Sequence, residues 1–195
     1  MRVISGRFKG MPLTTPKVGT RPTTDRTKEA IFSHLDSRGV LDDARVLDLF
    51  AGTGALGVEA LSRGARELVA VESSAPAAAL IARTLTALKH SRSWESDMSA
   101  RVIRARAEKY AASAVAAPFD VIFIDPPYAF ETEACNQLLS DLAGGDMISA
   151  RAVIVLERST RSDEPTAPAG WEITDRRDYG ETAVYYIEPV SVGIL

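Results

Sequence analysis

The chain has one cysteine, Cys135, and only two histidines among its 195 residues. A single cysteine cannot form an intramolecular disulfide, and it cannot build a metal site made of cysteines. No apolar run approaches the roughly 18 to 20 residues that a membrane-spanning helix needs. The apolar run near the N-terminus has three residues, far too few for a secretory signal. These absences predict a cytoplasmic protein that has no membrane partner.

The composition is that of a folded globular protein. Hydrophobic residues make up 46% of the chain and charged residues 25%, which are ordinary values for this class. A length of 195 residues suits one domain with a small appendage, so two independent enzymatic domains are not expected. We expect the protein to be a monomer.

Positive charge is concentrated at the start of the chain. Residues 1–28 hold seven Lys and Arg against one acidic residue, Asp25, whereas the remainder holds 16 basic and 25 acidic residues. A basic segment attracts phosphates locally, although the net charge of the whole chain is -3. The segment therefore predicts an anionic partner, with a solvated tail as the alternative.

Strand-like and helix-like segments alternate from residue 45 onward, which is typical of a parallel sheet with helices on both faces. Apolar residues recur at helical spacing over 80–88 and 134–142, and a short helix is expected over 55–61. The strands predicted in this part are residues 46–50, 68–71, 101–103, 119–124 and 152–156. The fourth of these is almost wholly apolar, as a strand covered on both faces must be.

The C-terminal part departs from this alternation. Residues 171–174 and 183–187 are strand-like runs with no helix between them. They predict an antiparallel hairpin at the edge of a mostly parallel, seven-stranded sheet.

The N-terminal part differs as well. Residues 2–4 and 11–13 flank a glycine-containing turn and predict a small β-hairpin, and Thr24 can cap a helix over 25–37. We therefore divide the chain into a basic N-terminal extension, residues 1–23, and an α/β domain, residues 24–195.

A glycine turn, residues 50–54, follows the first predicted strand. Gly52 and Gly54 lack side chains, which lets the backbone turn sharply and approach a ligand closely. Asp48 precedes the turn, and Glu72 closes the next strand, where a carboxylate can bind both hydroxyls of a ribose. The turn therefore predicts a nucleoside site. Because Gly57 completes the dinucleotide pattern G-x-G-x-x-G, NAD and a turn without any ligand stay open on this motif alone.

The fourth predicted strand ends in Asp125-Pro126-Pro127-Tyr128, here called the proline shelf. Two consecutive prolines fix the backbone and remove two N–H donors, which leaves carbonyl acceptors on a rigid segment. One hydrogen of an exocyclic amine can bind the Asp125 carboxylate and the other the Pro126 carbonyl, while Tyr128 stacks on the base. The shelf therefore predicts a site for a nucleobase amine and decides against NAD.

These residues resemble those of S-adenosylmethionine-dependent methyltransferases that modify amino groups of nucleobases. Within this group, the chain resembles the RsmD-type family, the guanine-N2 methyltransferases of small-subunit (16S) rRNA, over nearly its whole length. The narrowest part of the resemblance is the stretch RPTTDR, residues 21–26. Broader parts are residues 2–10, residues 47–65, the proline shelf and Tyr179-Gly180.

The resemblance implies a Rossmann-like class I methyltransferase fold, S-adenosylmethionine as cofactor with no metal, and 16S rRNA in an assembling small subunit as partner. The implied catalytic residues are Asp125, Pro126, Pro127 and Tyr128. The implied cofactor-binding residues are Asp48, Phe50, Gly52, Thr53, Gly54, Glu72 and Ala107. The implied RNA-binding residues are Arg7, Lys9, Arg21 and Arg26. Arg106 is a departure, because the family commonly has Asn or Asp there to contact adenine.

Two other functions stay open. A DNA adenine-N6 methyltransferase could use the same proline shelf, although 195 residues leave no room for a separate target-recognition domain. A catalytically idle RNA-binding or ribosome assembly factor could retain the fold, although the carboxylates Asp48, Glu72 and Asp125 are all present.

Overall fold

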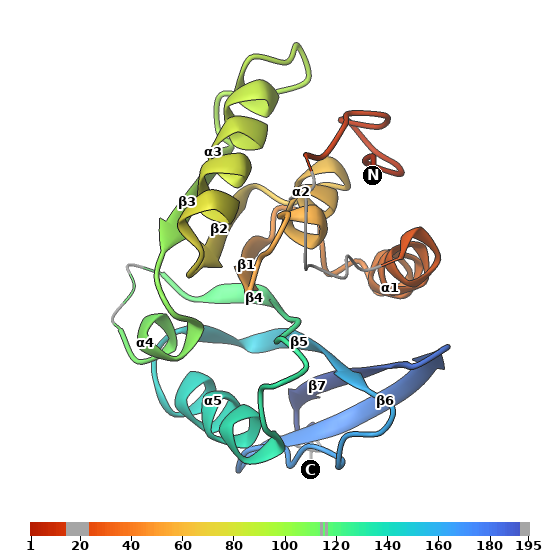
Figure 1. The fold of residues 1–195 in the computed structure, drawn as a ribbon, viewed down its shortest axis with the longest axis vertical. Helices are drawn as coiled ribbons and strands as arrows, with labels where there is room; N and C mark the ends of the chain where they lie inside the picture. The colour runs from red at the N-terminus through yellow and green to blue at the C-terminus, as the bar shows by residue number, and fades with distance from the viewer. Residues whose placement is uncertain (15–23, 114, 116, 192–195) are drawn as a thin grey trace.

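A computed structural model describes residues 1–14, 24–113, 115 and 117–191 of the protein. It contains one seven-stranded sheet with the strand order β3-β2-β1-β4-β5-β7-β6 (Figure 1). The strands are β1 (Arg45–Leu49), β2 (Glu67–Glu72), β3 (Ser99–Arg104), β4 (Phe119–Ile124), β5 (Ile148–Ser159), β6 (Trp171–Tyr179) and β7 (Thr182–Pro189). The helices are α1 (Asp25–Ser37), α2 (Ala55–Ser62), α3 (Ala75–Lys89), α4 (Ala107–Ala111) and α5 (Thr132–Gly144).

The pairing of the strands confirms the predicted fold. Strands β1 to β5 are parallel to one another. Strand β7 pairs antiparallel with β5, and β6 pairs antiparallel with β7 at the sheet edge. Three elements differ clearly from the sequence prediction: strand β6 continues to Tyr179 rather than ending near residue 174, and the other two are β5 and α4. Strand β5 begins at Ile148 rather than near residue 152, and the short helix α4 was not predicted.

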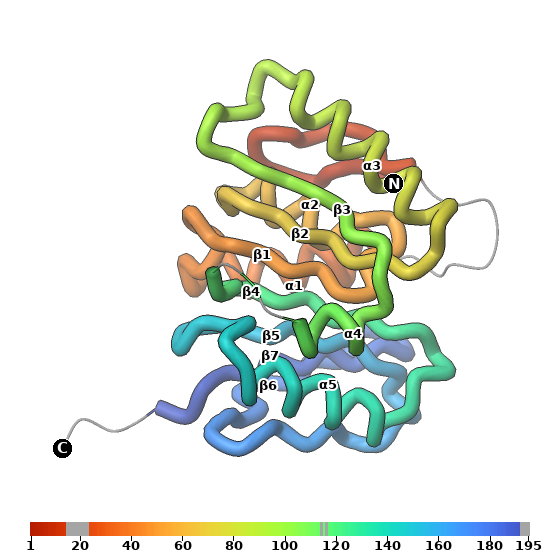
Figure 2. The backbone as a smooth tube through the Cα atoms, turned by 90° about the vertical axis from the view of Figure 1, so that its left-hand side faces the viewer, coloured from red at the N-terminus to blue at the C-terminus, as the bar shows by residue number. Residues whose placement is uncertain are grey.

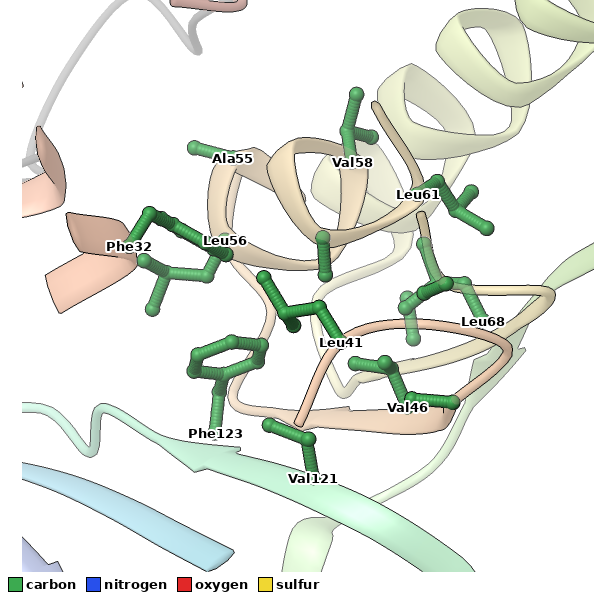
Figure 3. Close-up of a cluster of buried hydrophobic side chains, with 14 of the residues drawn as sticks. Phe32, Leu41, Val46, Ala55, Leu56, Val58, Leu61, Leu68, Val121 and Phe123 are labelled. Carbon is green, nitrogen blue, oxygen red and sulfur yellow. The ribbon is translucent and has the colours of Figure 1, made fainter. Parts of the chain in front are cut away.

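Helices cover both faces of the sheet, as Figure 2 shows. One buried cluster lies between the sheet and α1, α2 and α3, and a second lies between the sheet and α4 and α5. Figure 3 shows part of the first cluster, where Phe32 of α1 and Leu56 of α2 lie near Phe123 of β4. In the described part of the chain, none of the helices has the length and apolarity needed to cross a membrane.

Helix α1 begins where the sequence predicts. The Thr24 side chain accepts a hydrogen bond from the Thr27 backbone N–H, which satisfies one of the unpaired donors of the first turn. Ile31, Phe32 and Leu35 form the buried face of this helix. The cap and the buried face together place the start of α1 at the carboxyl-end side of the sheet, where the cavity described below lies.

The N-terminal hairpin packs against α2 (Figure 1). Its two arms are joined by a bridge between Arg2 and Pro12, and its apolar residues Val3, Phe8 and Leu13 belong to the first buried cluster. A Cβ atom on Gly6 would lie 1.9 Å from the backbone oxygen of Ser62, so the hairpin can approach α2 only with glycine at this position. The hairpin is therefore part of the packed structure.

Candidate active site

The carboxyl ends of β1 and β4 lie side by side in the middle of the sheet. Leu49, the last residue of β1, pairs with Ile124, the last residue of β4. The strand order reverses at this pair, because β2 lies on one side of β1 and β4 on the other. Such a reversal is the usual place for a ligand in an open α/β sheet. It brings the glycine turn and the proline shelf, which are 71 residues apart from Gly54 to Asp125, to one edge of the sheet.

The glycine turn has a backbone that few residues adopt readily. Gly52 and Gly54 have φ angles of +59° and +79°. Phe50 also has a positive φ, +57°, which is unusual for a residue with a side chain and stores strain at this position. The turn is held by a hydrogen bond from the Ala51 N–H to the Val71 carbonyl at 3.0 Å. This hydrogen bond fixes the turn, which follows β1, against the neighbouring strand β2.

Asp48 is a buried carboxyl directly beneath this turn. It is 2% exposed, and its Oδ2 accepts a hydrogen bond from the Gly57 N–H at 3.1 Å. Gly57 permits this contact, because a Cβ there would lie 2.5 Å from Leu68. Burial raises the pKa of Asp48 well above its ordinary value, and the nearby charges of Asp125 and Glu72 raise it further. The hydrogen bond from Gly57 opposes this rise only in part.

This raised pKa predicts how stability depends on pH. The folded state binds the Asp48 proton more tightly than the unfolded state, so stability falls as pH rises from about 4 through the raised pKa. Asp48→Asn keeps an acceptor for Gly57 but cannot ionise. Its free energy of unfolding should fall less with rising pH than that of the wild type. Urea unfolding of both proteins between pH 5 and pH 9 measures the difference, and parallel pH profiles would contradict it.

Glu72 joins the end of β2 to the glycine turn. One carboxylate oxygen accepts a hydrogen bond from the Gly52 N–H at 2.9 Å, and the other accepts from the Ser74 N–H at 2.7 Å. Each oxygen has a second lone pair, and Glu72 lines the cavity, so the carboxylate can also accept hydrogen bonds from ligand hydroxyls.

The proline shelf follows β4 and ends in a tight turn. The Pro127 carbonyl accepts a hydrogen bond from the Phe130 N–H at 2.9 Å. Within the described part of the chain, no backbone N–H donates to the Pro126 carbonyl. Tyr128 is 81% exposed, which is exceptional for a large aromatic side chain in this protein. The shelf therefore offers a backbone acceptor next to Asp125 and an exposed aromatic ring.

One cavity of about 990 Å³ joins the shelf and the turn. The ring of Phe50 packs edge-on against that of Phe130, with centroids 5.1 Å apart, and so connects the glycine turn to the residue whose N–H binds the Pro127 carbonyl of the shelf. All four predicted catalytic residues line this cavity. Six of the seven predicted cofactor-binding residues also line it, namely Asp48, Phe50, Gly52, Thr53, Glu72 and Ala107. Gly54 does not line it but forms the N-cap of α2.

The predicted RNA-binding residues are divided between two places. Arg26 is exposed at the start of α1 and lines the cavity. Arg7 and Lys9 do not line it, because their hairpin is bonded to the end of α2, where the Arg7 N–H donates to the Ser62 carbonyl. Arg7 also forms an ion pair with Glu95 at 3.3 Å. Arg21 lies outside the described residues.

Sequence reasoning missed several residues that line the cavity. Thr24 and Thr27 of the α1 start contribute to it, as do residues 179–182 of the β6–β7 turn. The end of β5 and the loop after it contribute Glu157, Arg158, Ser159, Arg161 and Ser162. The rule that ligands bind at the carboxyl ends of parallel strands applies to β5 as well as to β1 and β4, so it could have found residues 157–159.

Comparisons with known proteins identify relatives over nearly the whole chain. A family model described as "Conserved hypothetical protein 95" matches residues 1–188. The chain is 33% identical over 184 residues to Ribosomal RNA small subunit methyltransferase D of Escherichia coli (strain K12), covering 94% of this chain and 87% of the relative. It is 35% identical over 188 residues to YlbH of Bacillus subtilis (strain 168), covering 94% and 96%. The solved structure of yhhF from Escherichia coli has a TM-score of 0.82 at 32% identity and 97% coverage of both chains.

The strand order and the turn at the β1 end thus define the fold of the class I methyltransferases, which the similarity to solved structures supports. The chain belongs to the family described as conserved hypothetical protein 95, and its curated relatives confirm the predicted resemblance to the RsmD-type family.

Proposed function

We propose that the protein transfers the methyl group of S-adenosylmethionine to the N2 amine of a guanine in small-subunit rRNA. The name of the Escherichia coli relative, a small-subunit rRNA methyltransferase, supports the substrate class. The observation that carries the proposal is the position of the proline shelf beside the glycine turn in one cavity. An amine on the shelf and a cofactor on the turn can therefore meet.

The residues of the turn fit the cofactor. When bound, S-adenosylmethionine would supply a methyl group that its sulfonium makes strongly electrophilic; transfer would break the S–CH3 bond and form the N–CH3 bond, with S-adenosylhomocysteine as leaving group and one proton lost from the amine. The Glu72 carboxylate can accept hydrogen bonds from the ribose hydroxyls, and the glycine turn with Asp48 can hold the methionine end. Ala107 begins α4, and in the described part of the chain its backbone N–H donates to no backbone carbonyl. This N–H can bind the adenine where Arg106 replaces the usual acceptor side chain.

Asp125 and Pro126 act on the amine. The lone pair of guanine N2 is delocalised into the ring, so the amine is a poor nucleophile. Acceptance of its two hydrogens by the Asp125 carboxylate and the Pro126 carbonyl makes the nitrogen more electron-rich and favours pyramidal geometry in the transition state. Both acceptors lie on a rigid segment, so they also align the nitrogen with the methyl group.

The base must leave its helix or stack to reach this shelf. Enzymes that modify bases bind them unpaired or flipped, and an aromatic ring can replace the lost stacking. Tyr128 presents such a ring, because it is 81% exposed at the edge of the cavity.

The proposal is tested by methyl transfer from labelled cofactor into small-subunit particles, naked rRNA and DNA in parallel. We expect label in rRNA or in a partly assembled small subunit, and none in DNA. Label in DNA alone would support the adenine-N6 alternative. A protein that binds the cofactor in a thermal-shift assay but labels none of the three acceptors would support the idle assembly factor.

Arg26 should contribute to RNA binding. It is an exposed cation at the cavity rim, and each phosphate contact contributes about 0.7 to 0.9 to the slope of log affinity against log salt. Arg26→Ala should therefore weaken rRNA binding and reduce this slope by nearly 1. Arg151→Ala is the matched control, because Arg151 is exposed but does not line the cavity. An unchanged slope in Arg26→Ala would show that Arg26 does not contact a phosphate of the RNA.

A further inference from the structure

Arg158 is a buried cation with one buried hydrogen-bond donor, Nε, that has no partner. It is 7% exposed and lines the cavity. Its Nη2 lies 3.4 Å from the Thr132 hydroxyl, which is a weak contact, and its Nε is buried without any hydrogen-bond partner. Burial of a guanidinium in this state costs free energy, so the arrangement favours a ligand that brings an acceptor.

The position of Arg158 relative to the shelf suggests which acceptor that is. Strands β4 and β5 are parallel, and Ile124 pairs with Leu156. Pro126 follows two residues after Ile124, beyond the end of β4, whereas Arg158 follows two residues after Leu156 and is still within β5, paired with Ala183 of β7. The side chain of Arg158 reaches the start of α5 at Thr132, just beyond the shelf. The guanidinium therefore lies on the β5 side of the bound base.

The chemistry of guanine matches this arrangement. With its N2 amine on Asp125 and Pro126, a guanine presents O6 on the same edge, with only N1 between the two substituted carbons. An arginine that donates to guanine O6 or N7 is the commonest specific contact between proteins and bases. An adenine with its N6 amine on the shelf would present a C2–H at the equivalent position and would leave the arginine unpaired.

We propose that Arg158 donates hydrogen bonds to O6 of the target guanine and thereby selects guanine over other purines that carry an amine. This inference rests on the proposed function, and it adds a residue that determines substrate specificity. The guanidinium does not touch the transferred methyl group. It determines which base binds to the shelf, so its loss should change the ratio of the methylation rates of different bases.

The test replaces the O6 of the target base. Once the methylated position is mapped with the wild type, rRNA is prepared with either guanine or 2-aminopurine there. 2-Aminopurine keeps the N2 amine but has hydrogen in place of O6. The wild type should methylate guanine roughly 5- to 150-fold more efficiently in kcat/KM, the range expected for one base contact by arginine. Arg158→Met should reduce this ratio to near 1, mainly by slowing guanine, and Arg158→Lys should reduce it partly.

Arg161→Ala is the matched control for charge. Arg161 lines the same cavity, but its side chain is 76% exposed and paired with Glu181 at 3.4 Å. Its loss should leave the ratio between guanine and 2-aminopurine unchanged. If Arg158→Met lowers both rates equally and reduces the salt dependence, Arg158 binds a phosphate and the inference is wrong.

The melting temperature of Arg158→Met distinguishes a role in base selection from a purely structural role of Arg158. Because methionine has a similar volume and no charge, replacing a buried cation whose Nε has no hydrogen-bond partner should preserve or raise the melting temperature. A melting temperature well below that of the wild type would show that Arg158 supports the fold, and would overturn the inference. If the wild type methylates no guanine at all, the proposed function fails first, which is a different outcome from an unchanged base ratio.

Discussion

Asp125→Ala should abolish detectable methyl transfer while cofactor binding stays largely intact. Asp125 lies on the shelf rather than on the glycine turn, so its loss removes an acceptor of the amine and leaves Glu72 and its contacts with Gly52 and Ser74 unchanged. Loss of one group that stabilises developing charge in a transition state costs about 100- to 1000-fold in kcat. Single-turnover transfer of labelled methyl and a thermal shift with cofactor measure the two properties separately.

Two further variants show whether the acceptor is the cause. Asp125→Asn keeps one acceptor oxygen but loses the charge, so its loss of rate should be smaller than that of Asp125→Ala. Asp163→Ala removes the same charge from an exposed position in the neighbouring loop and should have little effect. Equal rates of methyl transfer for Asp125→Ala and the wild type would show that Asp125 takes no part in the reaction.

Glu59→Ala should lower the free energy of unfolding more than any other substitution described above. Glu59 is fully buried in α2, and its two carboxylate oxygens accept hydrogen bonds from the N–H groups of Ile4 and Ser5 at 2.8 and 3.1 Å. It also lies 3.3 Å from Nζ of Lys28, another fully buried residue, and 3.0 Å from Nε of Arg63. This carboxylate thus connects the N-terminal hairpin, α1 and α2.

Removal of one partner from a buried ion pair leaves a buried charge without compensation, which costs about 3 to 5 kcal/mol. We expect a loss of this size in the free energy of unfolding of Glu59→Ala, measured by urea denaturation. The double variant Lys28→Met with Glu59→Gln removes both charges and keeps one acceptor oxygen for the hairpin, so it should recover part of the loss. A Glu59→Ala protein as stable as the wild type would refute this description of the hairpin contact.

The central part of the fold could be predicted because its signals are local. An apolar run such as residues 119–124 must be covered on both faces, and the predicted run coincides with β4. The same holds for the C-terminal hairpin, whose two runs have no helix between them and pair as β6 and β7. The contact between turn and shelf was also predictable, because both follow strands and the carboxyl ends of parallel strands share one edge.

Features that depend on distant contacts were not predictable in this way. Glu59 occupies a position in α2 between Val58 and Ala60, where a charged residue usually indicates an exposed face. Its burial arises from the hairpin, more than 50 residues earlier in the sequence. Arg158 lies near the end of β5, where a charged residue is equally ordinary, and only the packing against α5 shows that it is buried. In the N-terminal extension, the positive charge predicted an anionic partner but gave no sign that Val3, Phe8 and Leu13 join the core.

Much of the cavity wall also depends on distant contacts and was not predictable from the sequence. Its walls come from the start of α1, the ends of β1, β2, β4 and β5, and the β6–β7 turn. Motifs identified the parts that we propose to contact cofactor and amine, because those parts need unusual residues such as glycine and consecutive prolines. The remaining walls use ordinary residues, and their positions follow only from the folded chain.

The identity of the methylated nucleoside tests the account most directly. RNA labelled by the wild type in the small-subunit assay is digested to nucleosides, which are separated and identified by mass spectrometry. The account predicts the label in N2-methylguanosine alone. Label in N6-methyladenosine, in a methylated pyrimidine or in a ribose would show that the shelf does not hold a guanine amine, and would contradict the proposed reaction.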